Sequence, residues 1–157
     1  MRERVEGAIN KSGQPISFGS MPHDHEIYMT LVECAREQRD REGLVKYGTL
    51  LMELARRDDH HLYAAIASRA MGVAERLAGR LTQSEALLKQ AQDLFSALGA
   101  RWQCGRTLTE LGELELARPR KSTSKAHEYY ASALQLFEEM QAMPYADGAR
   151  RALAKLS

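Results

Sequence analysis

The chain has 157 residues, the length of a single domain that buries a contiguous core without disulfides or metals. Its 22 basic and 21 acidic side chains leave a net charge of +1, so no overall field draws it onto nucleic acid or an anionic membrane. Ala, Leu, Glu, Arg and Gln dominate and β-branched residues are few, which favours helix throughout. We therefore expect an all-α protein whose partner is a protein, a peptide or a small ligand.

The N-terminal segment 1–24 differs from the rest of the chain. It mixes glycine, proline, serine and asparagine and has neither the period of a helix nor that of a strand. We predict a linker or flexible arm over residues 1–24 and a helical domain over 25–157. No run approaches the roughly 20 apolar residues that span a bilayer, and the N-terminus is charged where a signal peptide is apolar.

Cys34 and Cys104 are the two cysteines, and they lie far apart on segments with helical periodicity. Neither belongs to a Cys-x-x-Cys motif, so buried reduced thiols are favoured over a disulfide. Together with the missing leader, this predicts a cytoplasmic protein.

From Glu26 onward the apolar residues recur at helical spacing, and seven helices are predicted. Their approximate bounds are 25–39, 41–57, 60–79, 82–98, 101–118, 124–142 and from 144 onward. We expect Asp58-Asp59 to cap the third helix and Gly79 to end it in a left-handed turn. Thr82 and Glu85 have the spacing of a capping box for the fourth helix.

The helical pattern repeats along the chain. Gly72 and Gly112 are separated by about 40 residues, and Ala91 and Ala133, on the helices that follow them, are separated by a similar interval. A small residue on one helix lets the next helix approach, and alternating small and large residues on that helix fill the groove between them. Helices three to six are therefore predicted to be two copies of one hairpin.

The later copy resembles the tetratricopeptide repeat. Leu108-x-x-Leu111-Gly112 matches the pattern of its first helix, and Ala126-x-x-x-Tyr130-x-x-Ala133 matches that of its second. The phrase from Leu94 to Ala100 is also similar to longer repeats near the C-terminus of large bacterial ATPases and regulators, where such arrays serve as sensor or docking domains. The resemblance implies a right-handed α-solenoid of about three hairpins and a final helix.

The same resemblance implies a partner-binding site, because the first helix of each repeat lines the concave face. Carried onto this chain, it gives seven groove positions: Ile66, Arg69, Val73, Arg76, Arg106, Thr109 and Glu113. Three arginines on one wall would suit an acidic side chain or a peptide carboxylate through bidentate hydrogen bonds. The alternative, that the arginines only keep the groove soluble, is equally open.

Other residue clusters favour structural roles. His23, His25, His60 and His61 could ligate a metal, but they stand at predicted helix starts and capping is the better account. Glu113 and Glu115 point to different sides of a helix, which favours solvated surface charge over a catalytic pair. The basic stretches 118–121 and 150–151 lack interleaved aromatic residues, and Trp102 has core spacing.

No nucleotide-binding loop, nucleophile elbow or zinc-protease motif occurs in the sequence. We therefore expect a non-enzymatic, cofactor-free interaction or sensor module that holds a protein or peptide partner, which the arginines suggest is acidic. The alternative is an assembly module, either a homodimer or a part of a larger multidomain regulator.

Overall fold

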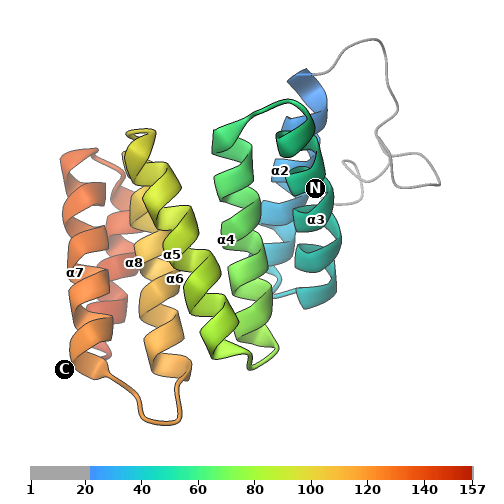
Figure 1. Cartoon of the computed structure of the whole chain (residues 1–157). Helices are drawn as coiled ribbons and strands as arrows, with labels where there is room; N and C mark the ends of the chain where they lie inside the picture. Colours follow the sequence, from blue (N-terminus) through green and yellow to red (C-terminus); the bar gives the residue numbers. More distant parts are fainter. Residues whose placement is uncertain (1–21, 157) are drawn as a thin grey trace.

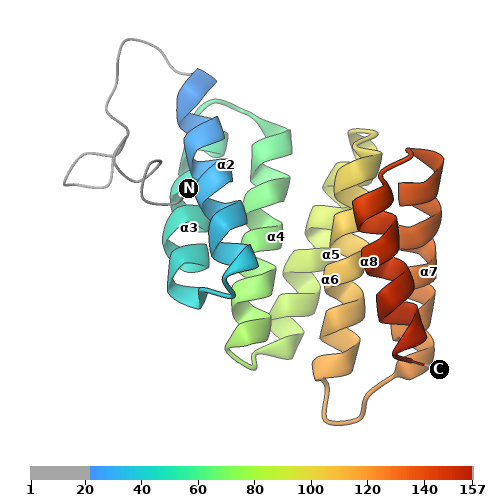
Figure 2. The ribbon, with the colours of Figure 1, turned by 180° about the vertical axis from the view of Figure 1, so that it is seen from behind.

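The computed structural model describes residues 22–156, and this part of the chain is all-helical. It contains seven helices, which pack in chain order as a solenoid-like row from α2 and α3 at one end to α7 and α8 at the other (Figures 1 and 2). Their bounds are α2 Pro22–Glu37, α3 Arg41–Arg57, α4 His61–Leu77, α5 Leu81–Ala97, α6 Arg101–Ala117, α7 Thr123–Glu139 and α8 Met143–Ala154. The predicted all-α fold is confirmed.

The helices are regular in length and spacing. The five from α3 to α7 each have 17 residues, and α3, α4, α5 and α6 begin at residues 41, 61, 81 and 101. One hairpin therefore takes about 40 residues, and the longer connector 118–122 shifts α7 and α8 slightly along the chain. Helix α2 begins at Pro22, inside the predicted arm, and residues 1–21 of that arm lie outside the described part of the chain.

Five of the loops have the same conformation. Each has three residues, and the middle residue has a positive φ: Arg39, Asp59, Gly79, Gly99 and Gln141. The amide of the third residue donates to the carbonyl five residues earlier, at 2.7 to 2.9 Å, which satisfies a carbonyl at the helix end. The left-handed turn predicted at Gly79 is confirmed.

Both predicted N-terminal caps are wrong. The residue that precedes α4 is His60 and the residue that precedes α5 is Arg80, and neither makes a side-chain capping bond. Because the shared loop reverses the chain just after Gly79, α5 begins at Leu81 and Thr82 is already inside it. The side-chain caps of the described helices are Asp40, which accepts from the Gly43 amide, and Ser122, which accepts from the Lys125 amide.

The two copies of the repeat have matching seams between their helices. An added Cβ on Gly72 would lie 2.8 Å from Leu88, and one on Gly112 would lie 2.8 Å from Tyr130. Ser84, which stands where the later copy has Ala126, donates its hydroxyl to the Gly72 carbonyl at 2.7 Å. The glycines therefore serve the same close approach in both hairpins, as the spacing predicted.

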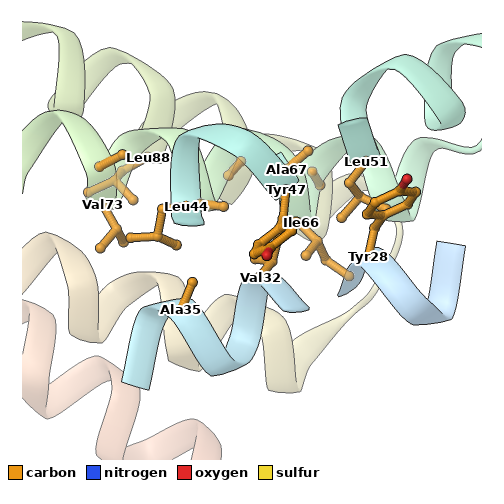
Figure 3. Packing of buried hydrophobic residues seen from close by; sticks show 14 of the residues in the cluster. Tyr28, Val32, Ala35, Leu44, Tyr47, Leu51, Ile66, Ala67, Val73 and Leu88 are labelled. Atoms are coloured by element: carbon orange, nitrogen blue, oxygen red, sulfur yellow. The ribbon is translucent and has the colours of Figure 1, made fainter. Parts of the chain in front are cut away.

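The core follows these seams through the described residues. Around α2, α3 and α4 it is apolar and closely packed, with Tyr28, Tyr47, Leu51 and Ile66 among its largest members (Figure 3). Each helix buries its face mainly against its neighbours in sequence, as in a repeat array. No helix within residues 22–156 has the length and apolarity needed to cross a membrane.

Candidate interaction groove

The helices α2, α4, α6 and α8 line two adjoining hollows on one side of the molecule, which we call the groove. The first hollow has a volume of about 320 Å³ and its lining is mostly charged: Arg36, Glu37, Arg39, Val73, Arg76, Leu77, Thr109, Glu110 and Glu113. The second has a volume of about 220 Å³ and extends to α8: Arg36, Glu37, Arg106, Thr109, Glu110, Phe137, Pro144, Tyr145, Gly148 and Ala149. Thr109 and Glu110 of α6 lie at the junction of the two.

Five of the seven predicted groove residues line these hollows. Val73, Arg76, Thr109 and Glu113 line the charged hollow, and Arg106 and Thr109 line the other. The remaining two, Ile66 and Arg69, lie beneath the surface, with 1% and 2% of their areas exposed. The positions implied by the resemblance therefore lie on the side of the helices that carries the hollows, except that Ile66 and Arg69 are buried below its surface.

The predicted arginines are bound to carboxylates of the chain itself. Glu33 of α2 accepts from Nη1 of Arg106 at 3.0 Å and from its Nη2, and also from Nη2 of Arg69 at 3.3 Å. Arg69 additionally donates to the Gln103 carbonyl at 3.3 Å, and its guanidinium lies over the Phe95 ring. These two guanidinium groups are thus engaged inside the protein and are not displayed as free cations.

Glu110 of α6 is the second carboxylate at the centre of this charge cluster. It accepts from Nη2 of Arg76 at 2.7 Å and from Nη1 of Arg36 at 3.3 Å. Arg36 also donates to Glu33 at 3.2 Å and to the exposed Glu37. Three helices, α2, α4 and α6, therefore meet at two shared carboxylates.

The environment of Glu33 lowers the pKa of its carboxyl group. Burial alone would raise the pKa of Glu33, but the hydrogen bond from Arg106 and the charges of Arg106, Arg69 and Arg36 outweigh it and lower the pKa to about 2. Burial and the neighbouring Arg106 lower the pKa of Arg69, which stays charged at neutral pH. Glu33 and Arg69 therefore both carry their charge at neutral pH.

The hollow beside α8 has an aromatic wall. The Tyr145 ring meets Trp102 edge-on at 5.3 Å and Phe137 at 5.4 Å between centroids, and Arg106 lies over Trp102 at 4.6 Å. Tyr145 keeps 41% of its area exposed. A ring or aliphatic side chain of a partner could pack against this wall, while the charged hollow next to it offers polar contacts.

The structure also shows the surroundings of the glutamates and histidines that the sequence singled out. Glu115 was expected at a solvated surface, but it is buried and pairs with Arg118 at 3.3 Å, because the chain turns into the connector there. Glu113 accepts from the Tyr130 hydroxyl at 3.2 Å. His25 and His60 pack with Tyr63, and His25 Nε2 lies 3.3 Å from Asp58; the described residues contain no group of three metal-ligating side chains.

The groove also contains residues that the sequence interpretation missed. Arg36 lies one repeat before Arg76, and Gly148 lies one repeat after Arg106, so the repeat spacing itself could have found both. Glu33 lies two repeats before the predicted groove residue Glu113, so the same spacing could have found it too. Glu110 carried no such signal, because the equivalent positions, Thr30 and Ala70, hold other residues. The roles of Glu33 and Glu110 depend on which helices meet on the side of the molecule that carries the groove.

Comparisons with known proteins add nothing to the interpretation of the groove, which rests on the residues of this chain. A scan of protein-family models gives no match to the chain, and a search of curated proteins gives no relative.

Proposed function

We propose that the chain is a non-catalytic interaction or sensor module that binds a peptide or a partner domain in the groove formed by α2, α4, α6 and α8. The observation that carries this proposal is the continuous pair of hollows, charged at one end and aromatic at the other, along helices held by repeated packing. Stacked helical repeats commonly offer extended surfaces for ligands.

The proposal that this is a tetratricopeptide-like domain is supported by three features. The hairpins recur at intervals of about 40 residues, the seam glycines Gly72 and Gly112 meet large side chains in the same way, and small residues flank those side chains. The longer period resembles the arrays of large bacterial regulators. In such a protein this domain would act as a sensor or docking element in the cytoplasm, a compartment that also suits the two free thiols, Cys34 and Cys104.

The chemistry of the groove favours binding over catalysis. The carboxylates of Glu33 and Glu110 are held by arginines, and such pairs stabilise structure and do not leave a base free to accept a proton. The charges of the lining are close to balanced, so shape and apolar contact would select the partner together with local ion pairs. An acidic partner would have to compete with Glu33, Glu37 and Glu110 for the same guanidinium groups.

A groove-blocking variant tests the proposal. Thr109 lines both hollows, so Thr109→Arg places a long charged side chain at their junction. The probe is a phage-displayed library of random dodecapeptides selected on the wild-type chain. We expect selected peptides with a shared pattern that lose binding to Thr109→Arg by at least about tenfold.

Thr49→Arg is the matched control, since Thr49 is exposed on α3, outside the groove. Both variants should keep the wild-type helix content by circular dichroism. Peptides that bind Thr109→Arg and wild type equally well, or no shared pattern after selection, would reject the groove as the binding site.

Self-assembly is the second candidate, and one observation favours it. The exposed large apolar side chains of the described residues are Leu98, Met143 and Tyr145, which lie in or next to the α5–α6 and α7–α8 loops. Exposed apolar side chains that gather into one contiguous patch are typical of an interface. Sedimentation of the wild type and of Met143→Glu separates the cases: a dimer that the substitution dissociates supports assembly, and a wild-type monomer at high concentration rejects it.

A further inference from the structure

The charge cluster joins parts of the fold that a repeat array normally leaves apart. In such an array each hairpin touches only its neighbours, so the first and third hairpins have no contact and the curvature of the row is soft. Here α2 and α6 belong to the first and third hairpins, with α4 between them. Their side chains nevertheless meet, over sequence separations of 73 and 74 residues.

Two ion pairs link α2 and α6, and the donor lies on α6 in one pair and on α2 in the other. Glu33 of α2 accepts from Arg106 of α6 at 3.0 Å, and Arg36 of α2 donates to Glu110 of α6 at 3.3 Å. Each helix thus contributes one cation and one anion, one helical turn apart on each helix. Such a reciprocal pair resists sliding of one helix along the other, because any shift lengthens at least one of the two links.

The middle hairpin is tied into the same links. Arg69 of α4 reaches Glu33 at 3.3 Å, and Arg76 of α4 reaches Glu110 at 2.7 Å. Arg69 is almost fully buried, and its donation to the Gln103 carbonyl anchors it on α6 as well. The spacing between α2 and α6 is therefore set by guanidinium groups of fixed shape, whereas apolar side chains could slide or repack.

We infer that Glu33, Arg36, Arg106 and Glu110 form a clasp, the α2–α6 clasp, which couples the first hairpin to the third and fixes the curvature of the groove. The array then unfolds as one unit, where a simple nearest-neighbour row would unfold hairpin by hairpin. A partner in the groove meets a concave wall that is already shaped, since Arg36 and Glu110 also line both hollows.

The test uses unfolding in urea followed by two signals. Trp102 is the single tryptophan and reports on α6, while far-ultraviolet circular dichroism reports on all helices. In the wild type the two transitions should coincide. In Arg36→Met, which cuts one link and leaves Glu110 with Arg76, the helical signal should be lost first, with its midpoint lower by about 0.5 M urea or more.

Arg101→Met is the control, because Arg101 pairs with Glu139 of α7 inside a single hairpin. It should leave the two transitions coincident. Small-angle X-ray scattering in the absence of urea should show a larger radius of gyration for Arg36→Met than for Arg101→Met. A second variant, Glu33→Gln, cuts the other link; if it does not fold, Arg36→Met decides alone. Coincident transitions and an unchanged radius in Arg36→Met would overturn the clasp.

Discussion

The seams within the hairpins and the concave side between them are held together in opposite ways. In the α6–α7 seam, Gly105 and Gly112 allow Phe137 and Tyr130 to pack against the backbone, and close apolar contact stabilises the pair of helices. On the concave side, by contrast, Glu33 and Glu110 hold three helices through ion pairs. The seams need small and large residues at fixed spacing, whereas the concave side needs particular charges on helices distant in sequence.

The largest effect is expected in the seam. Phe137→Ala removes a buried ring from between α6 and α8 and should lower the free energy of unfolding by about 3–5 kcal/mol, because the rigid helices cannot close the cavity. Gln135→Ala on the exposed side of the same helix is the control and should change little. Urea unfolding at neutral pH measures both, and a loss below about 1 kcal/mol for Phe137→Ala would show that the seam repacks freely.

A smaller effect is expected on the concave side when the pH falls. The pKa of Glu33 is about 2 in the folded chain against an ordinary value of 4.5, so its stabilisation is complete above pH 4.5 and is lost as the pH falls through about 2. We expect a loss of about 2–3 kcal/mol over this window. Unfolding measured from pH 5 to pH 2 should show a shallower decline in Glu33→Gln, and equal slopes in the two proteins would contradict the assignment.

The smallest effect is expected for a single methyl group in the seam. In Gly112→Ala the new Cβ would lie 2.8 Å from the Tyr130 ring, so α7 must move outward, at a cost of about 1–2 kcal/mol after the gain in helix propensity. Gly148→Ala is the matched control, since a Cβ there would meet nothing closer than 4.0 Å. Thermal unfolding compares the two, and a stabilised Gly112→Ala would mean that the seam has spare room.

Local sequence patterns predicted the all-helical fold because the residues that pack each hairpin together lie within that hairpin. Spacing alone could pair Gly112 with Tyr130 and Gly72 with Leu88. The glycines at 79 and 99 could likewise predict the two loops in which they lie. The capping box predicted for α5 was wrong because the three-residue loop that recurs along the chain starts this helix at Leu81. Thr82 and Glu85 therefore already lie inside the helix. Five of the seven residues predicted for the groove line the two hollows, Glu113 among them, but Glu33 and Glu110 were not predicted.

The sequence by itself determined the all-helical class, the period of the repeat and the side of each helix that faces its hairpin partner, since these depend on residues within about one repeat of each other. Only the tertiary structure decided that the arginines at 69, 76 and 106 are neutralised by Glu33 and Glu110. That pairing depends on how α2, α4 and α6 pack side by side. Because this arrangement is the sum of many small packing angles, no local pattern of residues encodes it.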